Sequence, residues 1–308
     1  MKVHGPIIEK IQYISPDGQA YNIHTPPKRS ILEMDGWGMS PKNLFTTSGP
    51  FQHGETVIGI RLAPRTIRML VRHNGCSRSD FWGVRDTILD LIRPNRVSLV
   101  NPSPGRLRYQ YLRNGVRQVR DLDVYLNRGY TFESKRGQWD EFSVQEEVEF
   151  IAHNPVIYDP TLITVNVTAF VEGLVLPLTF PFVLGAYGAL QNITYTGSFE
   201  SYPTLEVTGP ADCFTIINTT TDTRISLDYT ISAGEIVTFD LGYDIKSVTN
   251  NFGSNLLGYL TSNTDLGGFR LETAPTAPVG VNALQIYLEG PTAATAVAVK
   301  YYRNYIGI

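Results

Sequence analysis

Apolar and polar residues alternate with a period of two through most of the chain, which is the pattern of half-buried β-strands. Turn residues separate the alternating runs. In Ser15-Pro16-Asp17-Gly18 the proline presets φ and the glycine accepts a positive φ, and Ala63-Pro64-Arg65 forms a second break. These breaks predict two hairpins, one joining 7–14 to 19–23 and one joining 56–62 to 66–71.

A helical period replaces the alternation only over 79–92. Ser79 is the expected N-cap, Asp80 suits the positive end of the helix dipole, and Pro94 prevents the helix from continuing. Spacings of 3, 4 and 7 predict one buried face made of Phe81, Trp82, Ile88, Leu89 and Ile92.

The sharpest local signal is Asn114-Gly115, the preferred pair for a type I′ turn, between strands 106–113 and 116–126. Alternation places Arg106 and Arg108 on one face of this hairpin and Leu107, Tyr109 and Tyr111 on the other. Residues 138–152 alternate in the same way, with acidic residues between the apolar ones, and predict another half-exposed strand.

The second half contains no credible helix, and short strands recur there every 8 to 15 residues. This spacing is typical of an antiparallel β-sandwich or jelly roll. The expected strands are 162–170, 176–180, 193–195, 204–208, 213–218, 224–229, 235–240, 247–249, 268–272, 282–289 and 296–302.

Charge supports a division into two domains. Up to residue 155 the chain has 21 Lys and Arg against 16 Asp and Glu, and beyond it 5 against 13, so a net of +5 is followed by a net of −8. The two prolines within 154–160 interrupt regular structure at this point. We therefore predict a domain at 1–155, with β-strands around one helix, and a β-sandwich domain at 156–308.

Composition excludes several classes of protein. The chain is 42% hydrophobic and 18% charged, which predicts a folded protein, and its net charge of −3 excludes a uniformly basic nucleic-acid coat. No apolar run is long enough for a membrane-spanning helix, and residues 1–6 lack the apolar core of a signal peptide. Cys76 and Cys213 fit neither a disulfide framework nor a zinc site.

Candidate catalytic groups are weak. No two of the five histidines are three or four residues apart, and His73 near Cys76 lacks a third orienting group. We therefore expect no metal, no cofactor and no enzyme activity. A glycosidase would need a carboxylate pair, for which the second half offers Glu200, Glu206, Asp212 and Asp228 without an aromatic frame.

The arginines of the 106–126 hairpin have three interpretations: a subunit interface, a solvated edge, or a nucleic-acid stripe with stacking tyrosines. Acidic residues interleave with the arginines, and the tyrosines lie on the opposite face, so an interface fits best. The candidate interface residues are Arg106, Arg108, Arg113, Arg117, Arg120, Asp121 and Asp123.

The layout resembles the distal tail proteins of long-tailed phages, which have an N-terminal β-sandwich or barrel-like domain with one helix and a galectin-like antiparallel β-sandwich after it. The stretches that carry the resemblance are 50–58, 78–93, 106–120, 204–210, 216–218, 231–235 and 297–308.

The resemblance implies a structural protein of the phage tail tip, located in the virion and made in the host cytoplasm. Its N-terminal domains would form a ring, expected to be a homohexamer, that joins the tail tube protein to the hub or tail-associated protein. Its C-terminal domains would hold receptor-binding proteins or contact cell-surface glycan. The alternative is a carbohydrate-binding adhesion protein of a tail fibre or baseplate periphery. Neither interpretation involves nucleic acid or membrane insertion.

Overall fold

A computed structural model describes residues 10–93, 100, 102–129, 139–140, 143–167, 187–243 and 245–308. The chain forms two compact units. Unit 1 comprises Met1–Pro160 together with Tyr305–Ile308, and unit 2 comprises Thr161–Asn304. The chain therefore passes between the units twice, and the last four residues, which the sequence assigns to the second domain, pack in unit 1. The described part contains no helix long and apolar enough to cross a membrane.

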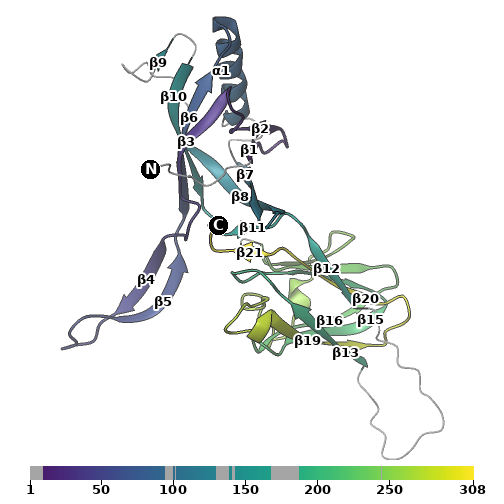
Figure 1. Ribbon diagram of the computed structural model, residues 1–308. Coiled ribbons are helices and arrows are strands. Elements are labelled where there is room, and N and C mark those ends of the chain that lie inside the picture. The colour runs from purple at the N-terminus through teal and green to yellow at the C-terminus, as the bar shows by residue number, and fades with distance from the viewer. Residues whose placement is uncertain are drawn as a thin grey trace, which may run out of the picture. The chain divides into compact units, whose positions relative to one another are not determined.

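Unit 1 is built on an antiparallel sheet with the strand order β2-β1-β7-β8-β10-β6-β3 (Figure 1). Three short strands lie off this order: β9 pairs with β10, β11 pairs with β8, and β21 pairs with β11. The strands are β1 (Lys10–Ile14), β2 (Ala20–Asn22), β3 (Arg29–Asp35), β6 (Arg65–Asn74), β7 (Gly105–Arg113), β8 (Val116–Arg128), β9 (Trp139–Asp140), β10 (Ser143–Ala152), β11 (Ile157–Tyr158) and β21 (Asn304–Tyr305).

Alternation along these strands creates the core of unit 1. In β10, Val144, Val148 and Phe150 are buried while Glu147 is exposed, and β10 pairs with β6 along its whole length from Ser143 opposite Asn74. The pairing of β1 with β2 confirms the first predicted hairpin, although residues 1–9 lie outside the described residues.

Helix α1 (Arg78–Ile92) confirms the one predicted helix, with two corrections. Its N-cap is Ser77 rather than Ser79, because the Ser77 side chain accepts a hydrogen bond from the Asp80 amide, and Asp80 in turn accepts one from the Cys76 amide. Ile88 is buried as expected, whereas Trp82 is exposed, so the apolar face is narrower than predicted.

The second predicted hairpin is wrong. Strand β5 (Thr56–Leu62) pairs not with β6 but with β4 (Lys42–Thr47), and the two form a separate two-stranded sheet that we call the arm. Figure 1 shows the arm extending from unit 1 as an isolated ribbon. The chain returns to the main sheet at Arg65, whose side chain is buried. Strand β6 begins there and pairs with β10 and β3 instead of β5.

Unit 2 is an antiparallel β-sandwich, as predicted. One sheet has the order β12-β20-β14-β17-β18 and the other β13-β19-β15-β16, and residues of both sheets form one hydrophobic core that includes Phe239 and Phe214. The strands are β12 (Ile163–Val167), β13 (Tyr187–Thr194), β14 (Thr204–Thr208), β15 (Ala211–Asn218), β16 (Thr223–Ile231), β17 (Ile236–Asp240), β18 (Ser247–Asn250), β19 (Val281–Glu289) and β20 (Ala296–Tyr301).

Two details of unit 2 differ from the sequence prediction. Residues 268–272 form no strand, only a bridge between Leu271 and Ser201, and two short 3-10 helices, Leu257–Tyr259 and Pro278–Gly280, interrupt the β structure. The strand expected at 176–180 lies outside the described residues.

Candidate functional site

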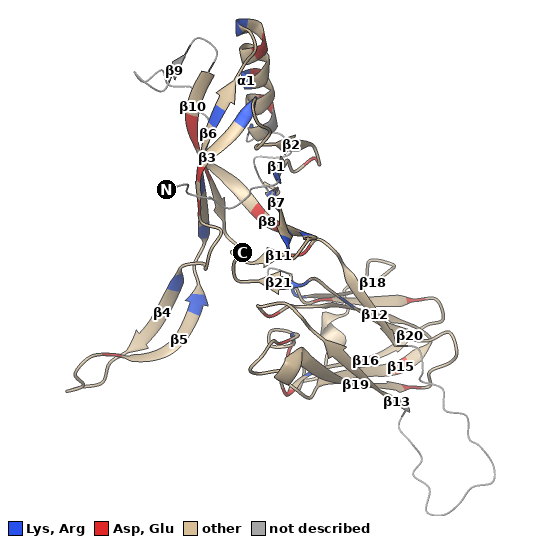
Figure 2. Ribbon diagram, in the orientation of Figure 1, with Lys and Arg blue, Asp and Glu red and all other residues tan. Residues whose placement is uncertain are grey.

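The β7–β8 hairpin forms as the sequence predicts. Asn114 and Gly115 both have positive φ, at 52° and 76°, which is the requirement of a type I′ turn. Leu107 and Tyr109 are buried on one face of the hairpin, and Arg108 lies on the other. In Figure 2, positive and negative positions stand close together on these two strands.

Most of the predicted interface residues pair within the chain. Asp121 is fully buried (0% exposed) and receives both Nε and Nη2 of Arg108 at 2.8 Å. Arg106 lies 3.6 Å from both Asp121 and Asp123, and the Tyr158 hydroxyl donates to Asp123 at 2.9 Å. The hydrogen bond to Asp121, followed by the attraction between the two charges, raises the pKa of Arg108. This cluster joins β7, β8 and β11 into one layer.

The side chain of Arg120 also forms its contacts inside unit 1. Its guanidinium donates to the Val119 carbonyl at 2.7 Å, lies 3.7 Å from the Asp159 carboxylate and stands 4.0 Å from the centre of the Tyr305 ring. Arg120 lies opposite Tyr109 in the hairpin, so alternation places it on the face of Leu107 and Tyr109 and not on the face of Arg106 and Arg108. Two of its partners, Asp159 and Tyr305, come from distant parts of the sequence.

Arg113 and Arg117 differ from the other five candidates. Both are exposed at the tip of the hairpin, and neither forms an ion pair with any described residue. Exposed Leu112 lies opposite Arg117 and exposed Val116 lies opposite Arg113. The hairpin tip therefore combines two exposed cations with two exposed apolar side chains.

The arm is the feature that the sequence interpretation missed. Every residue of β4 is exposed, and so is most of β5. Apolar side chains nevertheless cover the arm, namely Leu44, Phe45, Val57, Ile58 and Ile60. Its acidic and basic residues are confined to the root (Lys42 and Arg61) and the tip (Glu55), and the ribbon between them is uncharged in Figure 2.

The β propensity of Phe45, Thr46 and Thr47 was the available signal for the first strand of the arm. A two-stranded hairpin alone is marginally stable in water, and exposed apolar surface of this kind marks an interaction site.

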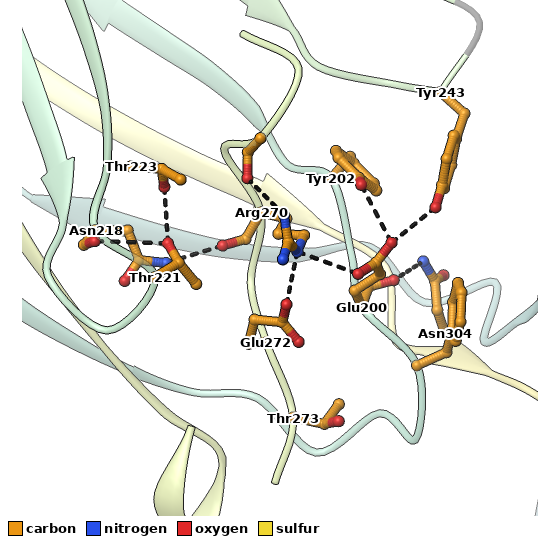
Figure 3. Close-up of polar contacts among 12 residues, drawn as sticks. Glu200, Tyr202, Asn218, Thr221, Thr223, Tyr243, Arg270, Glu272, Thr273 and Asn304 are labelled. Atoms are coloured by element: carbon orange, nitrogen blue, oxygen red, sulfur yellow. Dashed lines mark hydrogen bonds and ion pairs between the residues drawn. The ribbon is translucent and has the colours of Figure 1, made fainter. Parts of the chain in front are cut away.

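Unit 2 contains a polar and aromatic cluster around Glu200 (Figure 3). The hydroxyls of Tyr202 and Tyr243 donate to the same Glu200 oxygen at 3.1 and 2.7 Å, and Arg270 Nε lies 3.1 Å from the other. Arg270 also binds Glu272 at 2.6 Å. Partial desolvation of the phenol, and then its bond to Glu200, raise the pKa of Tyr243, which keeps that hydroxyl a donor at neutral pH.

The other candidate chemistry is dispersed. Three of the four carboxylates considered for a glycosidase have different partners: Glu200 binds Tyr202, Tyr243 and Arg270, Glu206 binds Lys300, and Asp228 accepts from Cys213. Burial, and then the Asp228 hydrogen bond, raise the pKa of Cys213. Within the part of the chain that the structure describes, no three His, Cys, Asp or Glu side chains gather as metal ligands would.

The fold of the two units is similar to that of solved phage proteins. It is the fold of a phage hub protein. The chain superposes on the crystal structure of the SPP1 Dit protein, described as a paradigm of the hub adsorption apparatus in phages that infect Gram-positive bacteria. The TM-score is 0.62 at 12% identity, over 95% of this chain and 98% of the Dit chain.

A chain of the phage P2 baseplate in its activated conformation with calcium is also similar, with a TM-score of 0.50 at 11% identity over 97% and 99% of the two chains. No protein-family model matches the sequence, and no curated protein matches it. The predicted resemblance to tail-tip hub proteins is thus confirmed at the level of the fold, through both units.

Proposed function

We propose that this protein is a structural component of a phage tail tip, where unit 1 of each subunit joins the next in a closed ring. The observation that carries the proposal is the likeness to the SPP1 hub protein along nearly the whole of both chains. In this role the ring connects the tail tube protein to the hub or tail-associated protein, and unit 2 carries host-attachment proteins. No catalytic step is needed.

The arm supplies the material for a contact between subunits. A ring of identical subunits needs a heterologous interface, in which one surface meets a different surface of the neighbour. An uncharged ribbon of exposed apolar side chains fits such a contact, since a neighbouring copy would bury it. The exposed tip of the β7–β8 hairpin, with Arg113 and Arg117, is a second candidate contact because its cations have no ion-pair partner among the described residues.

The location can be tested by immunogold electron microscopy of phage particles that carry this protein. An antibody against the chain should label the distal end of the tail and no other part of the particle. Labelling spread along the tail or on the head would contradict a tail-tip role, and labelling confined to lateral fibres would favour the adhesion alternative.

The Glu200 cluster favours carbohydrate binding as a second candidate function, acting through unit 2. The Tyr243 ring is 55% exposed, its hydroxyl is fixed by Glu200, and Arg270 holds two carboxylates beside it (Figure 3). Fixed polar groups next to an exposed aromatic ring are the elements of a polyol-binding surface. A glycan array should then show binding that Tyr243→Ala abolishes and that the surface control Tyr287→Ala leaves intact. The absence of any glycan binding would remove this function.

A further inference from the structure

The side chain of Arg65 is buried (1% exposed) in unit 1 without a carboxylate partner in any ion pair among the described residues. It donates instead to four backbone carbonyls. Nη1 reaches Gly36 and Gly38 at 3.0 and 2.7 Å, Nε reaches Pro155 at 3.1 Å, and Nη2 reaches Ile306 at 2.6 Å. Burial lowers the pKa of Arg65 to about 10, and it remains a cation at neutral pH.

These carbonyls belong to three segments that are far apart in the sequence. Residues 36–41 lead into β4 and form the root of the arm, together with Ala63, whose amide donates to Pro41 at 2.8 Å. Residues 154–160 carry the chain out of unit 1, and Tyr305–Ile308, which we call the return segment, bring it back.

The return segment packs closely against other residues of unit 1. Tyr305 stacks against Arg120, Arg65 binds the Ile306 carbonyl, and the Ile308 amide donates to Trp37 at 3.0 Å. A Cβ on Gly307 would stand 2.8 Å from both the carbonyl carbon and the oxygen of Gly38, so only glycine allows this approach. Arg120 bridges the same two crossings as Arg65, because it also contacts Asp159 in the outgoing segment.

We propose that Arg65, Arg120 and the return segment form a clasp that makes the arm root and both crossings between the units open and close as one cooperative element. One guanidinium can donate hydrogen bonds to carbonyls of three segments at once. When one segment moves away, the buried charge of Arg65 loses a hydrogen bond, and the contacts with the other two segments become less stable. This inference concerns the single chain and does not depend on ring formation.

Hydrogen exchange measured by mass spectrometry on the full-length chain tests the clasp. Arg65→Lys keeps the charge but loses the fork, so peptides covering 36–41, 155–159 and 305–308 should exchange faster by a common factor of about ten or more. Gly307→Val acts on the same clasp from the return segment and should produce the same three-segment pattern. Peptides at the far end of β6 should be unchanged in both variants.

Val71→Ala is the matched control, because Val71 is buried in the same strand but lies away from the clasp. It should accelerate exchange through the core of unit 1 without selecting the three segments. Acceleration of only one segment in Arg65→Lys would show that the segments open independently and would overturn the clasp. A pattern in both clasp variants that matches Val71→Ala would show general destabilisation and would overturn it equally.

Discussion

At the scale of single residues, burial decides which arginines hold the fold and which are free to meet a partner. Arg108 and Arg120 belong to one alternating hairpin with Arg117, yet the first two pair with carboxylates of unit 1 and Arg117 is exposed to solvent. A buried carboxylate such as Asp121 tolerates burial only while its cations remain in place.

Arg108→Ala should therefore destabilise unit 1 by about 2–4 kcal/mol, because Asp121 stays buried without its bidentate partner. Arg117→Ala should change the stability by less than about 0.5 kcal/mol. Urea unfolding followed by tryptophan fluorescence measures this in unit 1 alone, since Trp37, Trp82 and Trp139 are the only tryptophans. Equal small losses in both variants would mean that the Asp121 cluster contributes nothing to the fold.

His73 should make unit 1 sensitive to acid. Burial, and then the charge of Arg29, lower the pKa of His73 to about 4. The contribution of neutral His73 to the free energy of unfolding is fully present above the unfolded pKa of about 6.5. It is lost as the pH falls from there to about 4, because the unfolded state binds a proton that the folded state does not bind. The loss reaches about 3 kcal/mol.

The corresponding measurement is urea unfolding by tryptophan fluorescence between pH 7 and pH 4. His73→Gln should flatten the decline over this window, whereas His53→Gln, on the exposed arm, should retain it. An unchanged slope in His73→Gln would assign the acid sensitivity to other groups.

At the scale of elements, the arm has strands of normal length but no sheet behind it. Its apolar side chains contribute little to the isolated chain, because they are exposed before and after folding. They contribute to assembly only if a partner covers them.

The double substitution Phe45→Ser and Ile58→Ser should weaken self-association by at least about 100-fold, because these side chains are 47% and 67% exposed in the single chain and would be buried in a ring. The fluorescence unfolding midpoint should stay within about 2 °C of the parent. Analytical ultracentrifugation gives the association constant. Val279→Ser, at an 87% exposed site in unit 2, is the control; an equal effect there would deny the arm a specific role.

Local signals predicted individual elements well, and long-range contacts limited the rest. Asn114-Gly115 specifies its own hairpin, and the period of α1 specifies a helix. The sequence indicated the wrong partner for 56–62. The alternation of a strand does not specify which other strand it pairs with, and Ala63-Pro64-Arg65 has the composition of a hairpin turn. The buried roles of Arg65 and Arg120 depend on carbonyls and side chains up to 241 positions away, which no local pattern encodes.

At the scale of the whole molecule, two compact units share one chain that crosses between them twice, and unit 1 presents the bare arm. The likeness to a phage hub protein extends over both units. The proposed ring would bury the five exposed apolar side chains of the arm against a neighbouring subunit.

The most direct test is the native mass of the full-length chain by multi-angle light scattering over a range of concentrations, with negative-stain images of the same peak. The account predicts a closed ring with a central opening, whose mass is six times the 34.3 kDa of one chain, and its loss in the Phe45→Ser and Ile58→Ser double variant. A particle of 34.3 kDa at every concentration, or open filaments in place of rings, would contradict it.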